Sequence, residues 1–283
     1  IYDSPLKDWS DLDQLALPAH RIDEAATARD LARLEEAVGD ILPIHVDRSP
    51  VYKSWNGDIS YNLAELRGLN QLMLDLAESP REVHRLAALL RDGTLKAQAE
   101  AEVAGDWSTA ESLNQASPYC AELPPPRANS YGASRKDIFL FIAAQEFTLV
   151  SPRMFDEFIV QYQLPIIEHF GLVHYGCCED LTKKIKVLRQ IKNLRSIAVT
   201  PLANLARCAE QIGTDYVISW RPNPTDMVCA GFDRQRIRRI LSEGFAAARG
   251  CFLHINLKDV ETVEGHPERL AEWVQLARDI AEP

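Results

Sequence analysis

The sequence predicts an α/β protein with a parallel sheet, folded as a TIM (β/α)8 barrel. Short apolar segments alternate with amphipathic helical segments, which is typical of parallel strands joined by crossover helices. No glycine-rich loop follows an expected strand, so the fingerprint of a dinucleotide-binding open sheet is missing. Polar and reactive residues follow successive strands instead, at the edge where a barrel builds its active site.

Each expected element rests on a local signal. Short apolar runs predict the strands, which are Ile41–Val46, Ser112–Tyr119, Ile138–Ala144, Leu172–Tyr175, Arg195–Val199, Tyr216–Trp220 and Phe252–Leu257. Periodic apolar positions predict the helices, which are Asp23–Val38, Leu63–Glu78, Pro80–Gly105, Ser151–Phe170, Leu181–Ile191, Leu202–Ile212, Asp233–Arg249 and Pro267–Ile280. Ser79 and Ser151, each followed by proline, are typical helix starts. Gly213 and Gly250 are typical helix ends.

The number of expected strands is one fewer than a complete barrel has. About seven strands are expected where a barrel has eight, so the first barrel strand is predicted to be missing or displaced. The sequence begins at Ile1, with neither an initiator Met nor a signal peptide. We therefore expect residues 1–283 to form a single barrel domain, the C-terminal major part of a longer protein.

Composition narrows the classes of partner and compartment. The formal net charge is −10, which argues against nucleic acid because no basic excess is available to neutralise phosphates. No apolar run reaches the length of about 18 residues that a membrane span needs. The six cysteines occur without a secretory signal, so we expect free thiols in the cytoplasm.

The strongest chemical signal is the segment His174–Leu181, which follows an expected strand and contains two adjacent cysteines. We expect Cys177 and Cys178 to lie at a helix N-terminus, where the helix dipole favours thiolates. With His174 and Glu179 they make a plausible soft-metal site, for Zn²⁺ above all. The alternative is a structural role. In it one cysteine packs under the helix, Glu179 or Asp180 only caps that helix, and His174 faces the outer helices.

Two more candidates come from the first half of the expected sheet. Cys120 ends the candidate strand Ser112–Tyr119 and either points into the same mouth or is a small buried residue. Glu146 follows the strand Ile138–Ala144, where a carboxylate is either a site acid or base or a residue of the rim.

The loops after the last two strands add charged groups. Arg221 and Asn223 are each followed by proline, and the resulting stiff loop suits the binding of an anionic group. Lys258 and Asp259 follow the last strand and pair either with each other or with the site.

These segments resemble a known family. The resemblance is carried by Phe147–Arg153, Tyr175–Leu181, Arg221–Pro224, Asn256–Leu257 and Pro267–Arg269. Together they resemble the uroporphyrinogen decarboxylase-like superfamily, in particular the branch grouped with corrinoid-dependent methyltransferases. The similarity runs from about residue 20 to the end of the chain.

The resemblance implies a TIM barrel, usually a homodimer, with zinc in the methyltransferase members. These hold Zn²⁺ through a His-x-Cys motif after one strand and a Cys after the last, and the metal activates a thiol that accepts a methyl group from a methylated corrinoid. In this sequence His174 lies three residues before Cys177, and Lys258-Asp259 stand where the last cysteine is expected. The arginine-rich N-terminal segment of the decarboxylases is not found, which argues against porphyrinogen decarboxylation.

The leading hypothesis is a zinc-dependent methyltransferase-like enzyme, with methyl transfer between a corrinoid or methylated small molecule and a thiol. The corrinoid would be carried by a partner protein. Its expected residues are the metal ligands Cys177, Cys178, Cys120 and His174, the catalytic carboxylates Glu146, Glu179 and Asp259, and the substrate-binding residues Arg221, Asn223, Lys258 and Tyr175. The alternatives are a metal-free decarboxylase or lyase acting on a carboxylated substrate through Arg221, Glu146 and Asp259, and a non-catalytic tetrapyrrole- or corrinoid-binding barrel.

Overall fold

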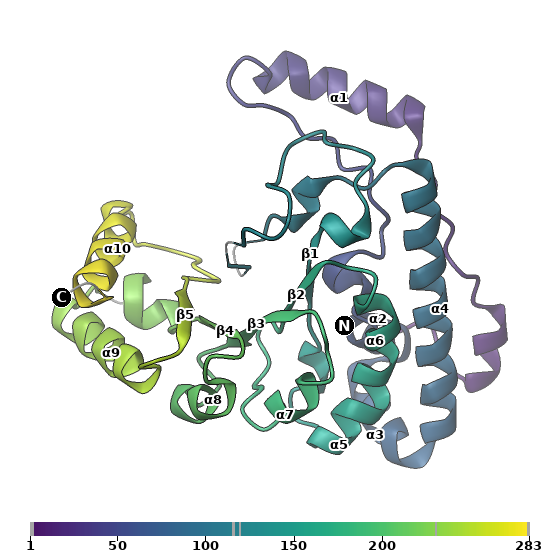
Figure 1. Cartoon of the computed structure of the whole chain (residues 1–283). Coiled ribbons are helices and arrows are strands. Elements are labelled where there is room, and N and C mark those ends of the chain that lie inside the picture. The colour runs from purple at the N-terminus through teal and green to yellow at the C-terminus, as the bar shows by residue number, and fades with distance from the viewer. Residues whose placement is uncertain (1–2, 115–116, 119, 230, 282–283) are drawn as a thin grey trace.

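A five-stranded parallel sheet organises the chain (Figure 1). The computed structural model describes residues 3–114, 117–118, 120–229 and 231–281. The strands are β1 (Phe139–Ile142), β2 (Leu172–Tyr175), β3 (Leu194–Val199), β4 (Val217–Trp220) and β5 (Phe252–Ile255). They lie side by side in chain order and every neighbouring pair is parallel, which confirms the predicted α/β class.

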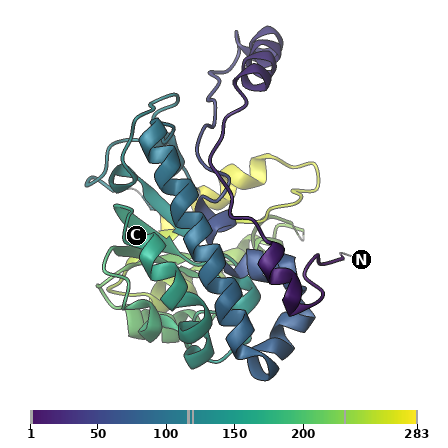
Figure 2. The same ribbon diagram turned by 90° about the vertical axis from the view of Figure 1, so that its right-hand side faces the viewer.

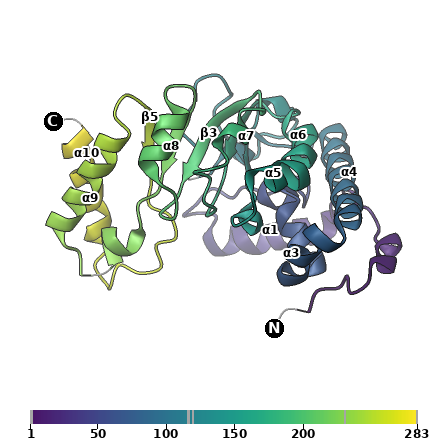
Figure 3. The same ribbon diagram turned by 90° about the horizontal axis from the view of Figure 1, so that it is seen from below.

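Helices connect each strand to the next. The connections are α5 (Pro152–Phe155), a π-helical segment (Asp156–Val160), α6 (Gln161–Ile167), α7 (Ile185–Leu188), α8 (Leu205–Ile212) and α9 (Arg234–Ala247), and α10 (Glu268–Ala281) follows β5. Asn204 and Asp233 cap the starts of α8 and α9 with their side chains. Each helix from α7 to α10 contacts the one after it, so together they follow the sheet along its length (Figure 3).

The first part of the chain is helical and packs beside β1. Its helices are α1 (Glu24–Val38), α2 (Ser60–Arg67), α3 (Leu69–Glu78) and α4 (Pro80–Ala104). The predicted helix Leu63–Glu78 belongs to two helices, because Gly68 adopts a φ of 83° between α2 and α3. Figure 2 shows α4 running along the body and α1 projecting from it, and α1 has no buried residue.

The two faces of the sheet differ in chemistry. The helix-facing side chains are apolar and almost fully buried, and they include Leu140, Ile142, Val173, Tyr175, Ile197, Val199, Ile218 and Trp220. Strand alternation places His174, Ser196 and Ser219 on the opposite face, and all three are also buried. A polar face of this kind is suited to a site, because its side chains need hydrogen-bond partners that a purely apolar core does not offer.

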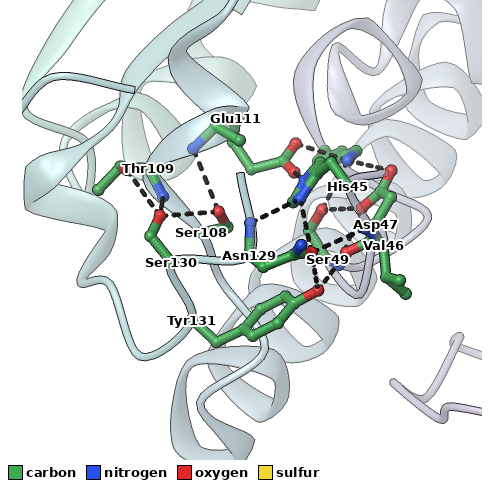
Figure 4. Close-up of polar contacts among 12 residues, drawn as sticks. His45, Val46, Asp47, Ser49, Ser108, Thr109, Glu111, Asn129, Ser130 and Tyr131 are labelled. Atoms are coloured by element: carbon green, nitrogen blue, oxygen red, sulfur yellow. Dashed lines mark hydrogen bonds and ion pairs between the residues drawn. The ribbon is translucent and has the colours of Figure 1, made fainter. Parts of the chain in front are cut away.

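One predicted strand is not a strand, and another lies partly outside the described residues. The strand predicted at Ile41–Val46 is wrong, because backbone groups of Ile44 and Val46 bond to side chains of another loop (Figure 4). Val46 N donates to Asn129 Oδ1 over 3.0 Å, and Tyr131 Oη donates to Val46 O over 2.7 Å. Ser112 ends a 3-10 helix, Thr109–Ser112, and three residues of the predicted strand Ser112–Tyr119 lie outside the described residues.

The closed barrel is not confirmed. In the part of the chain that the structure describes, the sheet has five strands, and β1 and β5 are its two edges. None of the helices in that part combines the length and apolar character needed to cross a membrane.

Close packing between α9 and β4 gives a first testable expectation. Gly244 faces Trp220, and a methyl group at this position would overlap the indole ring. Gly244→Ala is therefore expected to lower the free energy of unfolding by about 1–3 kcal/mol, the usual cost of overpacking. Denaturant titration measures the effect, with Ser242→Ala on the exposed face of α9 as the control. Equal stability of the two variants would contradict this packing.

Candidate functional site

Two cysteines and a lysine meet in a pocket at the carboxyl ends of the strands. This thiol pocket encloses about 610 Å³ and is lined by Ser54, Asn114, Phe141, Gln145, Cys177, Cys178, Lys258 and Asp259. Cys177 follows β2 and Lys258 follows β5, with two strands between them in the sheet. The sheet is therefore curved toward its polar face, so that residues from distant strands share one pocket.

A sharp turn after β2 presents the cysteines. Gly176 has a φ of 105°, and a Cβ there would lie 2.7 Å from Leu181 Cδ1 and 2.9 Å from Ala198 Cβ. Only glycine fits this conformation and this close approach. The chain then turns into the pocket with Cys177 buried and Cys178 exposed.

Buried side chains hold both ends of the Cys177 residue. Glu179 Oε2 accepts the Cys177 N–H over 2.7 Å, and Glu179 Oε1 accepts the Ala144 N–H over 2.8 Å. Arg221 Nη1 donates to Cys177 O. Glu179 and Arg221 are 1% and 2% exposed, so these charge-assisted bonds are shielded from water. The predicted catalytic Glu179 thus joins the end of β1 to the cysteine turn.

Lys258 donates hydrogen bonds to both thiols and affects their pKa values. Lys258 Nζ lies 2.9 Å from Cys177 Sγ and 3.2 Å from Cys178 Sγ, and the two sulfurs are 3.6 Å apart. The hydrogen bond from the Cys177 thiol, followed by those from Lys258, lowers the pKa of Cys178 to about 6 against the opposing effect of burial. The hydrogen bond that the Cys177 thiol donates to Cys178, and then burial, raise the pKa of Cys177. These two shifts favour a thiolate on the exposed Cys178 over one on the buried Cys177.

The ammonium and a carboxylate complete the charges of the pocket. Burial opposes the charge of Lys258, but its hydrogen bonds to Cys177 and Cys178 outweigh burial and raise its pKa. Asp259 Oδ2 lies 3.5 Å from Lys258 Nζ and 3.9 Å from Cys178 Sγ. Asp259 adopts a φ of 58°, a conformation that non-glycine residues seldom adopt outside functional or tight turns.

His174 lies beneath the pocket as a fully buried, neutral ring. Its Nδ1 is 2.7 Å from Ser196 Oγ, and its Nε2 is 3.0 Å from both Gly176 O and Arg221 Nη2. Burial, followed by the charge of Arg221, lowers the pKa of His174 well below its ordinary value. The ring also stacks on Phe141 at 5.4 Å between centroids. His174 thus supports Arg221 and Phe141 and does not line the thiol pocket.

The donor set as placed does not fit the expected zinc ion. A catalytic zinc site keeps three protein ligands, and no group of three or more His, Cys, Asp or Glu side chains is placed to hold a metal within the described ranges. Lys258 donates to both sulfurs and so occupies the cation position. Both ring nitrogens of His174 are engaged, and Cys120 lines a different pocket with Phe139 and Pro124.

The predicted helix N-terminus behind the cysteines is wrong. The first helix after β2 is α7, which begins at Ile185, so the helix dipole is not what stabilises the thiolate. Asp180 Oδ1 accepts the Thr182 N–H in a turn and is not the cap of that helix. The groups that lower the pKa of Cys178 are the Cys177 thiol and then Lys258, which lies 80 residues along the chain from Cys178.

Several other predicted site residues lie outside the thiol pocket. Tyr175 is fully buried on the helix-facing side, and its hydroxyl donates to Gln163 Oε1 over 2.7 Å. Asn223 Oδ1 accepts the Thr225 N–H within its own exposed loop. Glu146 accepts a hydrogen bond from Ser60 Oγ over 2.7 Å and lines a different pocket. Arg221, Glu146 and Asp259, required together by the lyase alternative, do not share a pocket.

The pocket also contains residues that the sequence analysis missed. Ser54 begins a 3-10 helix, Ser54–Gly57, and Asn114 lies in a loop, and neither belongs to a chemical motif in the sequence. Phe141 belongs to the strand β1. Gln145 lies in the pocket while its neighbour Glu146 points elsewhere. The signal for Gln145 was its position directly after a buried strand, which both residues share.

The fold has a counterpart among solved structures. It is similar to that of a methyltransferase from Methanosarcina mazei, with a TM-score of 0.56. The match has 12% sequence identity and covers 98% of this chain and 70% of the other. No family model matches the sequence, and no curated protein matches it. At this identity the likeness establishes a related α/β fold.

Proposed function

We propose that the protein is a methyltransferase-type enzyme whose reaction takes place in the thiol pocket. The observation that carries the proposal is the Lys258 ammonium, which donates to the sulfurs of both Cys177 and Cys178 in an open pocket. After the hydrogen bond from Cys177, the contact with Lys258 lowers the pKa of the exposed Cys178 thiol to about 6. The pocket lies at the strand ends, where α/β folds of this kind hold their substrates. The likeness to a methyltransferase fold supports methyl transfer over other reactions of a thiolate site.

In the proposed reaction Cys178 is a general base. Its thiolate takes the proton of a small acceptor thiol, which then attacks the methyl carbon of the donor. The new sulfur–carbon bond forms as the bond from the methyl carbon to its leaving group breaks, and the leaving group departs with the bonding electron pair. The pKa of about 6 suits Cys178 to this role, because a base near the working pH transfers protons efficiently.

Other groups of the pocket orient the reactants. Lys258 has three N–H donors and can hydrogen-bond the acceptor sulfur as it becomes anionic. Glu179 and Arg221 hold the Cys177 peptide, and through it the position of Cys178. Cys178 finally releases its proton to solvent, which restores the thiolate for the next turnover.

Zinc, a corrinoid donor on a partner protein and a homodimer stay predictions. The proposed steps use none of them, and zinc at this pocket would require Lys258 to move away from both sulfurs. Metal analysis of protein purified without chelator tests the point. A zinc content near one equivalent would favour the zinc-dependent hypothesis, and less than about a tenth would favour the metal-free site.

Removing the base is the direct test of the reaction. Cys178→Ser is expected to lower kcat/KM by about 10²–10⁴-fold, because an alcohol is too weak an acid to be ionised at neutral pH. The assay uses methylcobalamin as the donor and mercaptoethanol as the acceptor, with methylated mercaptoethanol as the measured product. Cys251→Ser, at a thiol outside the pocket, is the control. A wild-type rate in Cys178→Ser, or no methylated product from the unaltered protein, would count against the proposal.

A further inference from the structure

The two thiols of the pocket are unequal in a way that methyl transfer does not require. Cys178 is exposed to solvent, whereas Cys177 is 2% exposed. Their sulfurs are 3.6 Å apart, and each is a hydrogen-bond acceptor of Lys258. An accessible thiolate with a second thiol in contact behind it is the arrangement found in cysteine pairs that respond to oxidants.

We infer that Cys177 and Cys178 form an oxidation site, which peroxide converts reversibly into a disulfide between these adjacent residues. The exposed sulfur of Cys178 is the one that an oxidant reaches, and Lys258 Nζ donates a hydrogen bond to it over 3.2 Å. Cys177 is the resolving thiol, because its sulfur is the only one in contact with Cys178 among the described residues. This inference concerns the cysteines themselves, and only its effect on activity rests on the proposed function.

The two steps are balanced with hydrogen peroxide as the oxidant. The Cys178 thiolate attacks one peroxide oxygen, the oxygen–oxygen bond breaks, and hydroxide leaves as Cys178 sulfenic acid forms. The Cys177 sulfur then attacks the Cys178 sulfur, and the sulfenic oxygen leaves as water after taking a proton. The hydroxide of the first step takes a proton from solvent. One peroxide is thus reduced to two waters while one thiolate and one thiol lose two electrons and become a disulfide.

The surroundings of Cys177 favour reversibility. The sulfurs must approach by roughly 1.5 Å to reach the length of a disulfide bond, and a bond between adjacent residues distorts the peptide that joins them. That peptide segment is held in its present form by Glu179 at the Cys177 N–H and by Arg221 at the Cys177 carbonyl. Because strained and exposed disulfides are the readily reduced ones, a small dithiol should reopen this pair.

Mass spectrometry of the whole protein tests the site without any activity assay. The protein is treated with one equivalent of hydrogen peroxide, alkylated with N-ethylmaleimide and digested with trypsin. The peptide Met154–Lys183 contains Cys177 and Cys178 and no other cysteine. We expect this peptide to lose two hydrogens, to carry no alkyl group, and to recover two alkylation sites after dithiothreitol. Cys229 and Cys251 remain alkylated throughout and serve as internal references.

Variants separate the disulfide from other outcomes. In Cys177→Ser, Cys178 has no resolving thiol. With two or more equivalents of hydrogen peroxide it is expected to proceed to the sulfinic acid, which dithiothreitol does not reverse. The inference is overturned if the unaltered protein gives sulfinic acid at Cys178 with Cys177 alkylated, a disulfide between two chains, or no oxidation. If the peptide shows the disulfide but methyl transfer is absent, the oxidation site stands and the proposed function fails.

Discussion

Lys258→Met is expected to remove half or more of the thiolate at neutral pH and to lower methyl transfer by up to about 100-fold. Lys258 is the cation that donates to both sulfurs, and methionine keeps the length of the side chain without its charge. The hydrogen bond from Cys177 to Cys178 remains in the variant. We therefore expect the pKa of Cys178 to rise from about 6 toward the ordinary thiol value and not to exceed it.

The rate of alkylation of Cys178 as a function of pH measures this change. A thiolate reacts and a thiol does not, so in the unaltered protein the rate should reach half its maximum near pH 6 and be nearly maximal at neutral pH. In Lys258→Met the midpoint should move upward by about one pH unit or more, which lowers the rate at pH 6 by about fivefold or more.

A second lysine provides the matched control. Lys192 is exposed and lies outside the thiol pocket, so Lys192→Met removes the same charge from the chain without touching the sulfurs. Its alkylation midpoint and rate of methyl transfer should equal those of the unaltered protein. The same midpoint in Lys258→Met would show that Lys258 does not stabilise the thiolate.

Local signals in the sequence predicted much of the sheet and its crossover helices. Apolar runs marked β2, β3 and β4 to within a few residues, because buried parallel strands need such runs whatever surrounds them. The strand expected at Ile41–Val46 failed for a non-local reason. Its backbone groups bond to Asn129 and Tyr131, more than 80 residues away, and no local pattern announces such partners.

The site residues could likewise be predicted where the signal is local, but not where it depends on distant parts of the chain. Adjacent Cys177 and Cys178 after a strand were visible in the sequence, and so was the group at Lys258 after the last strand. What could not be predicted is that Lys258 crosses to the sulfurs, because this depends on how the sheet curves. That contact matters for the chemistry, since it places an ammonium group beside the thiols, where the sequence predicts a metal ion.

The buried carboxylate of Glu179 gives the largest expected effect on stability. It accepts two backbone N–H groups, those of Ala144 and Cys177, in a place that water does not reach. Glu179→Ala leaves both donors without a partner, at a cost of about 1–3 kcal/mol each. Part of this cost is offset at Asp58. Burial, and then repulsion from Glu146 and Glu179, raise the pKa of Asp58. The Glu179→Ala substitution removes one of these repulsions.

Glu179→Ala is therefore expected to lower the free energy of unfolding by about 2–5 kcal/mol, and Tm by roughly 5–15 °C. Thermal and denaturant unfolding measure both quantities, with the exposed Glu261→Ala as the control. Glu179→Gln keeps one acceptor oxygen for two donors and should fall between the two. If Glu179 also positions the thiol, the folded Glu179→Gln protein will show slower methyl transfer at an unchanged alkylation midpoint. A loss of stability alone, with full activity below Tm, would restrict Glu179 to a structural role, because the position of Cys178 would then not depend on the hydrogen bond to the Cys177 N–H.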